Sequence, residues 1–292
     1  MKTVQLPDGD RVPALGQGTR RMGENKSAHS DEVAALRLGI DLGMTLIDTA
    51  EMYGDGEAEK VVADAIDGQR DRVFVVTKVY PHNASHTELP KACERSLKRL
   101  RIEVIDLYLL HWRGDILLEE TVETFEKRRN AGKIRRWGVS NFDLDDMKEL
   151  NDEILMTNNE QKRSACSANQ VLYNLIEFEL LAWSRKKKIP IMAYSPVGHG
   201  RGLLENATLK KIAKRHVATC HAEASREGWT SAQIALAWVL RQDGVVAIPK
   251  ASNETHVREN AESAKIRLTK QDLAEIDREF PPPKSKRPLP ML

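Results

Sequence analysis

Short apolar runs alternate with amphipathic segments along most of the chain. Apolar runs of about four to eight residues are typical of buried strands, and apolar residues spaced by three or four positions are typical of helices. The predicted strands are Ala14–Thr19, Thr45–Ile47, Val73–Thr77, Val104–Leu110, Ile134–Val139, Ala165–Ala168, Ile189–Ala193 and Val245–Pro249. The predicted helices are Asp31–Leu42, Glu57–Asp67, Thr87–Leu100, Leu118–Ala131, Glu177–Lys188, Ser231–Arg241, Glu254–Ala264 and Gln271–Glu279.

This alternation predicts an α/β fold. Strands that alternate with helices about eight times favour a parallel sheet with right-handed crossovers, closed into a (β/α)8 TIM barrel rather than left open. Val4–Leu15, with the turn residues Pro7–Asp10, predicts an N-terminal β-hairpin, and we expect extra helices around the barrel. Because no Pro-, Gly- or Ser-rich linker divides the chain, we expect residues 1–292 to form a single domain.

Composition and charge exclude several classes of protein. The 45 Lys and Arg residues nearly balance the 43 Asp and Glu residues, so no net field attracts nucleic acid or a membrane surface. The cysteines, Cys93, Cys166 and Cys220, lack the spacing of a metal site or a disulfide framework. No apolar run is long enough to span a bilayer, and Met1–Arg11 lacks the apolar core of a signal peptide. We expect a cytoplasmic protein without nucleic-acid or membrane partners.

Polar and charged residues follow the apolar runs. In a (β/α)8 barrel the carboxyl ends of the strands converge on one mouth, where activity resides. Charged groups beside a core are costly unless they are paired, so a carboxylate, an ammonium and an imidazole at the ends of these runs indicate a chemical site. The residues expected at the mouth are Gly18, Thr19, Asp48, Lys78, His111, Ser140, Asn141, Gln170, Tyr194, Ser195 and Lys250.

Tyr53 follows Asp48 closely and adds a phenol to this mouth. An unperturbed tyrosine titrates at about pH 10, too high for efficient acid–base catalysis at neutral pH. A neighbouring Lys78 ammonium would lower the pKa of Tyr53, and Asp48 would hold and neutralise Lys78. His111 would then orient a carbonyl oxygen or share its proton. Such a site can give a proton to an oxygen on which negative charge develops. No cluster of metal ligands accompanies it, so we expect no bound metal.

The remaining mouth residues suggest a site for a nicotinamide dinucleotide. The amide and hydroxyl side chains offer hydrogen bonds to a carboxamide, and Tyr194 offers a flat face for a ring. The glycine-rich segment Gly198–Gly202 could hold a phosphate through backbone N–H groups, although such a segment is more often only a flexible turn. Lys250 and the N-terminus of the next helix would add positive charge. No GxGxxG motif follows the first strand, so a Rossmann site is not indicated.

Seven motifs resemble those of the aldo-keto reductase superfamily, in that family's order and across nearly the whole chain. They are Asp48–Gly54, Lys78, Asp106–Trp112, Gly138–Phe142, Asn169–Asn174, Tyr194–Pro196 and Ile248–Lys250. The resemblance implies a (β/α)8 barrel that binds NADPH, with NADH as a second cofactor. It also implies a monomeric oxidoreductase that reduces small-molecule carbonyl substrates (small aldehydes, dicarbonyls or ketoses) to alcohols, as in a bacterial branch of the family.

By the same resemblance, hydride passes from the cofactor to a carbonyl carbon while Tyr53 protonates the oxygen. Asp48 and Lys78 would tune Tyr53, and His111 would position the carbonyl. The residues assigned to the cofactor are Gly18, Thr19, Ser140, Asn141, Gln170, Tyr194, Ser195, Gly198, Gly200, Lys250, Ser252, Asn253, His256, Glu259 and Asn260. Those assigned to the substrate are Arg20, Tyr53, His111 and Trp112.

Three departures from the family pattern bear on specificity. Arg20 stands where the family usually has an aromatic residue; directed inward it would favour an anionic or polar carbonyl, but an outward, solvated side chain is the simpler expectation. His256 stands where the family often has an arginine that binds the 2′-phosphate, which should weaken the preference for NADPH over NADH. The segment Arg215–Trp229, which contains Cys220 and His221, looks longer than usual and is interpreted as a surface insertion rather than a metal or redox pair.

Two other functions stand as alternatives. A non-catalytic, nicotinamide-nucleotide-sensing regulatory subunit would bind the cofactor without turnover, but all four acid–base residues are retained here. A barrel hydrolase or metal enzyme would need a nucleophile or a ligand cluster, and this mouth has neither. Oxidation of NADPH or NADH by small aldehydes, dicarbonyls or keto sugars would distinguish the reductase from both.

Overall fold

The computed structural model describes residues 1–157, 166–175, 179–198, 202–217 and 228–281. Its strands are β1 (Thr3–Gln5), β2 (Arg11–Pro13), β3 (Gln17–Gly18), β4 (Leu46–Asp48), β5 (Phe74–Val79), β6 (Leu107–Leu110), β7 (Trp137–Ser140), β8 (Asn169–Leu172), β9 (Ile191–Tyr194) and β10 (Val245–Ala247). Its α-helices are α1 (His29–Asp41), α2 (Glu57–Ile66), α3 (Glu88–Leu100), α4 (Leu118–Asn130), α5 (Leu144–Thr157), α6 (Glu179–Lys187), α7 (Ala207–Val217), α8 (Ser231–Leu240), α9 (Glu254–Ser263) and α10 (Lys270–Glu279).

Strands β3 to β10 form one parallel sheet, in which each strand pairs with the next along the chain. The two edges of this sheet meet, because the backbone N–H of Gly16 donates to the Ala247 carbonyl at 2.8 Å and that of Gly18 donates to the Pro249 carbonyl at 3.0 Å. A Cβ at Gly18 would lie only 2.8 Å from the Ile248 carbonyl oxygen, so glycine is required for this close approach. The predicted eight-stranded barrel is therefore confirmed.

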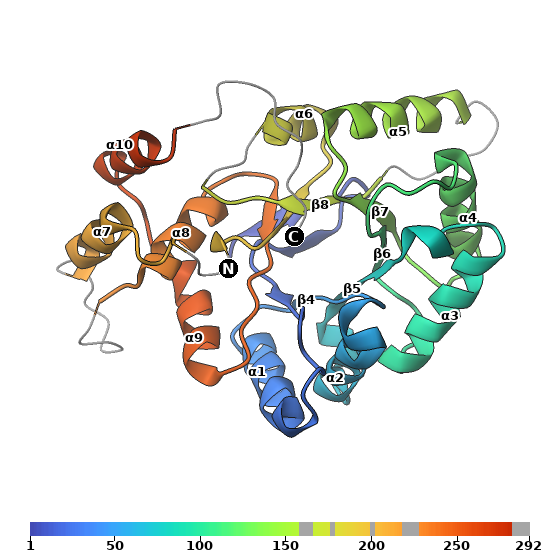
Figure 1. Ribbon diagram of the computed structural model, residues 1–292, viewed down its shortest axis with the longest axis horizontal. Helices are drawn as coiled ribbons and strands as arrows, with labels where there is room; N and C mark the ends of the chain where they lie inside the picture. The colour runs from blue at the N-terminus through green and yellow to red at the C-terminus, as the bar shows by residue number, and fades with distance from the viewer. Residues whose placement is uncertain (158–165, 176–178, 199–201, 218–227, 282–292) are drawn as a thin grey trace.

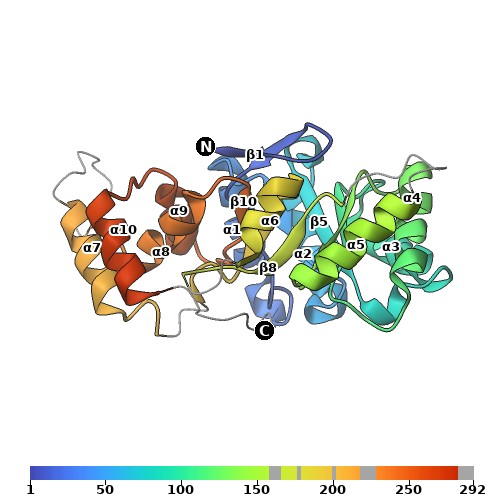
Figure 2. The same cartoon turned by 90° about the horizontal axis from the view of Figure 1, so that it is seen from above.

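The helices surround the barrel, as Figure 1 shows. Helices α1 to α6 each connect one barrel strand to the next, which is the alternation that the sequence predicts. Every residue of β4, β6, β7 and β8 is buried, as expected of strands enclosed by side chains on one face and helices on the other. Helices α7 and α10 lie side by side at one end of the molecule in both Figure 1 and Figure 2, and they account for the extra helices.

The predicted N-terminal hairpin is also present, since β1 and β2 pair in antiparallel fashion. Arg136 lies just before β7, and its guanidinium binds the carboxylates of Asp8 and Asp10 in the hairpin turn. Val4 and Val12 bury their side chains against the barrel. The hairpin therefore packs at the end where the strands begin, so it lies away from the mouth (Figure 2).

The segment that leads into β8 differs from the sequence prediction. The strand predicted at Ala165–Ala168 is wrong, because residues 166–168 are outside any strand and β8 begins at Asn169. Asn169 and Gln170 therefore lie within the sheet rather than after it. Asn169 is tolerated there because its Nδ2 donates to the Phe142 carbonyl at 2.8 Å. Because β8 begins with two amide side chains, a search for runs of apolar residues does not detect its first half.

Two helices were missing from the sequence prediction. In α5, Met147 and Leu150 are buried three positions apart, and Asp143 caps the helix by accepting from the backbone N–H groups of Asp145 and Asp146. In α7, the side chains of Lys210, Lys211 and Lys214 are exposed, as expected of a helix face that contacts solvent. The helical spacing of Met147 and Leu150 and the capping residue Asp143 are local signals from which α5 could have been predicted.

Candidate active site

A buried ion pair forms the floor of the barrel mouth. Asp48 is the last residue of β4, and Lys78 projects from the adjacent strand β5 with no exposed surface. The Lys78 Nζ lies 2.8 Å from Asp48 Oδ2, 2.8 Å from the Thr49 carbonyl and 3.4 Å from the Tyr53 hydroxyl. Burial lowers the pKa of Lys78, but Asp48 and Tyr53 outweigh it and raise that pKa above its usual value. Lys78 is therefore a permanent ammonium with all three donors satisfied.

The second oxygen of Asp48 is held from across the barrel. Gln170 Nε2, on β8, donates to Asp48 Oδ1 at 2.6 Å. Burial raises the pKa of Asp48, while Lys78 and Gln170 oppose that rise. In this structure Gln170 thus serves the carboxylate rather than standing free, and Asp48 is fixed by three strands at once.

Tyr53 begins a 3₁₀ turn, Tyr53–Gly56, directly after β4. Gly54 and Asp55 take left-handed backbone conformations there, with φ of 56° and 53°. The turn places the phenol ring over Lys78, with the Nζ 4.9 Å from the ring centroid. Burial raises the pKa of Tyr53, and Lys78 only partly opposes it, so the pKa is above its usual value. The expected lowering of this pKa by Lys78 is present, but desolvation is the larger effect and sets the net direction.

His111 follows β6 and faces Tyr53 across the mouth. The two ring centroids are 5.9 Å apart, with their planes at 77°. Burial, aided by the charges of Lys78 and Arg20, lowers the pKa of His111 to about 2. The imidazole is therefore neutral, with one N–H donor, and its Nδ1 has no hydrogen-bond partner among the described residues. A neutral donor beside a phenol is suited to hold a carbonyl oxygen.

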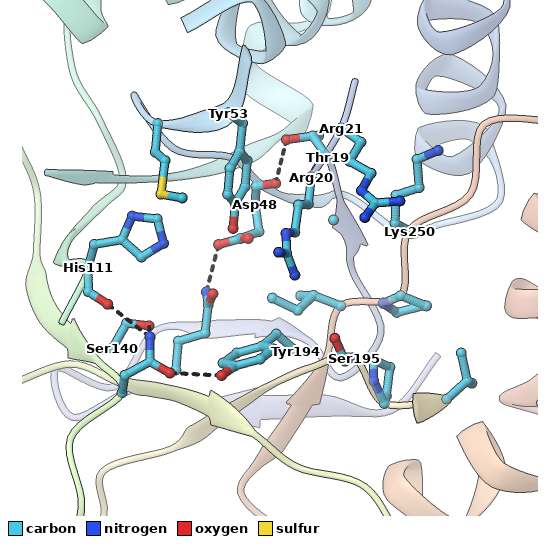
Figure 3. Close-up of a pocket in the computed structure, with 18 of the residues that line it drawn as sticks. Thr19, Arg20, Arg21, Asp48, Tyr53, His111, Ser140, Tyr194, Ser195 and Lys250 are labelled. Atoms are coloured by element: carbon cyan, nitrogen blue, oxygen red, sulfur yellow. Dashed lines mark hydrogen bonds between the residues drawn. The ribbon is translucent and has the colours of Figure 1, made fainter. Parts of the chain in front are cut away.

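Hydroxyl and amide side chains form the wall beside His111 (Figure 3). Asn141 has a φ of 59°, and its Nδ2 donates to the His111 carbonyl at 3.0 Å and to Ser140 Oγ at 3.1 Å. The Tyr194 hydroxyl donates to Asn141 Oδ1 at 2.8 Å. These hydrogen bonds fix the positions of Asn141 and Tyr194, so the wall is pre-organised before any ligand binds.

These groups line a cavity of about 660 Å³ at the mouth. It brings together most of the predicted site residues, and Lys78 lies beneath it. The predicted residues that line it are Gly18, Thr19, Arg20, Asp48, Tyr53, His111, Trp112, Ser140, Asn141, Gln170, Tyr194, Ser195, Lys250 and His256. The lining residues that were not predicted each lie within two positions of a predicted residue; they are Arg21, Met52, Pro196, Val197, Ile248 and Pro249.

A second hollow of about 540 Å³ adjoins the first near α9. Both hollows are lined by Lys250 and His256, and the second also includes the predicted Glu259 and Asn260. Ser252 and Asn253 line neither hollow; Ser252 accepts from Lys250 Nζ at 2.9 Å, and Asn253 caps α9. Gly198 is also outside both linings. Gly200 lies outside the described residues, as do Cys220 and His221 of the predicted surface insertion.

The Arg20 side chain does not point outward into solvent, which was the simpler expectation from the sequence. Its side chain is half-buried and enters the cavity, as Figure 3 shows, rather than extending into solvent. The backbone explains this, because Arg21 takes a left-handed conformation (φ 68°) that turns the chain back, and the following Met22 is fully buried. Arg20 is thereby confined to the mouth.

The described part of the chain contains no group of three or more His, Cys, Asp or Glu side chains suited to a metal ion. Within the same residues, no helix has the length and apolar character needed to cross a membrane. Cys93 and Cys166 are buried thiols, and burial raises the pKa of each to about 12.

The fold and the site define a class of protein: a (β/α)8 barrel with Asp48, Tyr53, Lys78 and His111 together at its mouth. Residues 14–279 match the model of the Aldo/keto reductase family, and the chain belongs to this family. The resemblance drawn from the seven sequence motifs is therefore confirmed.

Named relatives and solved structures agree with this assignment. The chain is 48% identical to methylglyoxal reductase YeaE of Escherichia coli, over 100% of this chain and 99% of that protein. It is 32% identical to glyoxal reductase of Bacillus subtilis, over 94% of this chain and 91% of the relative. An aldo/keto reductase from Klebsiella pneumoniae, solved in complex with NADP and acetate, superposes with a TM-score of 0.89 at 46% identity, covering 100% of this chain and 99% of that one.

Proposed function

We propose that this protein is an NADPH-dependent reductase that converts small aldehydes and dicarbonyls, of which methylglyoxal is the type, to alcohols. The observation that carries the proposal is the Tyr53 phenol, fixed beside a buried ammonium and opposite a neutral His111. The family assignment and the names of the two relatives support the same reaction. We further propose that it acts as a single-domain monomer in the cytoplasm.

The described residues fit a nicotinamide dinucleotide. The mouth cavity and the hollow beside α9 share Lys250 and His256 in their linings, and we take the two as one extended groove with Lys250 near its middle. The hydrogen-bonded wall of Ser140 and Asn141 would hold a carboxamide, and Tyr194 would contact the ring. The bound cofactor supplies the hydride that reaches the carbonyl carbon.

The protein's own residues supply the proton and the orientation. The neutral His111 imidazole donates to the carbonyl oxygen and aims it at the Tyr53 hydroxyl. As negative charge develops on that oxygen, Tyr53 transfers its proton, and Lys78 stabilises the phenolate that remains. Asp48 keeps Lys78 in place through the 2.8 Å ion pair.

The direct test is to follow NADPH absorbance with purified protein and methylglyoxal, glyoxal and a set of small aldehydes. We expect oxidation of NADPH with formation of the corresponding alcohol. Tight binding of NADPH without oxidation by any of these compounds would contradict a reductase and favour a nucleotide-sensing subunit.

The rate of reduction should be nearly independent of pH between about pH 5 and 9. His111, with its pKa lowered to about 2, remains neutral throughout this range, and Tyr53, with its pKa raised, keeps the proton that reduction requires. The rate should fall only as pH rises through the pKa of Tyr53. Initial rates at saturating NADPH and aldehyde check this, and an inflection near neutral pH would contradict a permanently neutral His111.

Replacing His256 by arginine should raise the affinity for NADPH about tenfold while changing that for NADH by less than about twofold. His256 lines both hollows, is exposed, and interacts through Nδ1 with Asn253 Nδ2 at 3.0 Å. A guanidinium there would add a bidentate, permanent clamp for the 2′-phosphate. Fluorescence titrations with each cofactor measure the effect, and equal gains for both would place residue 256 away from that phosphate.

A further inference from the structure

Arg20 is a cation that lies inside the mouth without a partner in the described part of the chain. Its backbone is anchored at the strand end, since the Thr19 N–H and Oγ1 both donate to the Asp48 carbonyl, at 3.0 and 2.9 Å. In Figure 3 its guanidinium extends into the cavity on the side of Tyr53 and Asp48. Among the described residues it makes no hydrogen bond through its side chain and no ion pair.

The described lining of the cavity offers no free anion that could satisfy this guanidinium. Asp48 is the only carboxylate among the described lining residues, and its two oxygens are taken by Lys78 and Gln170. The other charged side chains in the lining are Arg21 and Lys250, which are both cations. A half-buried guanidinium among cations is unfavourable unless an anionic ligand joins it.

Arg20 is also close enough to the acid–base centre for its charge to be felt there. Its charge contributes to the lowered pKa of His111 and opposes the rise in the pKa of Tyr53. An anion bound by Arg20 would therefore lie close to the carbonyl oxygen held between Tyr53 and His111, as the carboxylate of a small substrate would.

We propose that Arg20 binds the carboxylate of the substrate, so that the preferred substrates are anionic carbonyl compounds, namely oxo acids and aldehydes that carry a carboxylate. The planar guanidinium can take a carboxylate in a bidentate fashion while the carbonyl end reaches Tyr53 and His111. The inference rests on the proposed reductase function and adds the charge of the substrate, which neither neutral methylglyoxal nor glyoxal has.

The test compares two four-carbon aldehydes that differ in charge, succinic semialdehyde and butanal, at saturating NADPH. The wild-type protein should have the higher kcat/KM for the anionic aldehyde, and Arg20→Gln should lower the anionic-to-neutral ratio about 10- to 100-fold. Arg20→Lys keeps the positive charge but loses the bidentate hydrogen bonding of the guanidinium. Its anionic-to-neutral ratio should therefore lie between those of Arg20→Gln and the wild-type protein. Arg72→Gln removes an exposed arginine that pairs with Asp41, and it should leave the ratio unchanged.

The cofactor's phosphates are another source of negative charge that Arg20 could bind. Fluorescence titration with NADPH distinguishes binding of these phosphates from binding of the substrate carboxylate. A weaker affinity for NADPH in Arg20→Gln, with the substrate ratio unchanged, would overturn the proposal and assign Arg20 to the cofactor. Reduction of both aldehydes with a ratio that Arg20→Gln does not change would overturn it while leaving the reductase function intact. Failure of the wild-type protein to oxidise NADPH with either aldehyde or with methylglyoxal would overturn both.

Discussion

Replacing Tyr53 by phenylalanine is expected to lower kcat about 10³-fold while changing the affinity for NADPH by less than about threefold. The substitution removes one hydroxyl and keeps the ring over Lys78, so the carbonyl oxygen loses its proton donor but the cavity keeps its shape. The only hydrogen bond between described residues that the hydroxyl makes is the 3.4 Å contact with Lys78, so stability should change little. Single-turnover rates and fluorescence titration with NADPH measure the two effects separately.

Tyr108→Phe is a matched control for this substitution. Tyr108 is fully buried in β6, and its hydroxyl has no hydrogen-bond partner in the described part of the chain. Removing that hydroxyl should leave kcat within about twofold, because Tyr108 does not line the mouth cavity. Turnover by Tyr53→Phe at a rate close to that of Tyr108→Phe would remove Tyr53 from the role of proton donor.

Replacing Lys78 by methionine should lower the free energy of unfolding by about 3–5 kcal/mol, because it leaves the Asp48 carboxylate buried without its cation. Asp48 is only 2% exposed, so water does not replace the lost ammonium. The double variant Lys78→Met with Asp48→Asn removes both charges, and it should recover most of the lost stability while remaining inactive. Chemical denaturation of the two single variants and the double variant measures the coupling between the two residues.

An exposed ion pair serves as the reference for this effect. Lys148 and Asp145 lie 3.2 Å apart on α5, with side chains 54% and 65% exposed. Lys148→Met should therefore change the free energy of unfolding by less than about 1 kcal/mol. A loss in Lys78→Met no greater than that in Lys148→Met would mean that the Asp48 carboxylate is not dependent on Lys78.

The sequence allowed the barrel and the residues that gather at its mouth to be predicted, because both leave local signals. Asp48 and His111 interrupt apolar runs, which marks them as residues at the ends of strands. Lys78 was found by the same signal, although it lies inside β5 rather than after it. Because the strands of a (β/α)8 barrel are parallel, their carboxyl ends all lie at the same mouth.

What could not be predicted depends on contacts between distant segments. The hydrogen bond from Gln170 to Asp48 joins residues 122 positions apart, and no local pattern signals it. The inward orientation of Arg20 follows from the left-handed turn at Arg21, which composition does not reveal. The raised pKa of Tyr53 reflects desolvation of a half-buried phenol, and the extent of that desolvation is known only from the folded structure.

The contact between Gln170 and Asp48 also has a consequence for biosynthesis. A ribosome that has released only the first half of the chain has exposed Asp48, Tyr53 and Lys78, but not the amide that fixes Asp48. The edges of the sheet meet still later, when Ala247 and Pro249 become available to Gly16 and Gly18. The catalytic geometry is therefore completed only after nearly the whole chain has emerged, so the appearance of activity during translation or refolding reports on closure of the entire barrel.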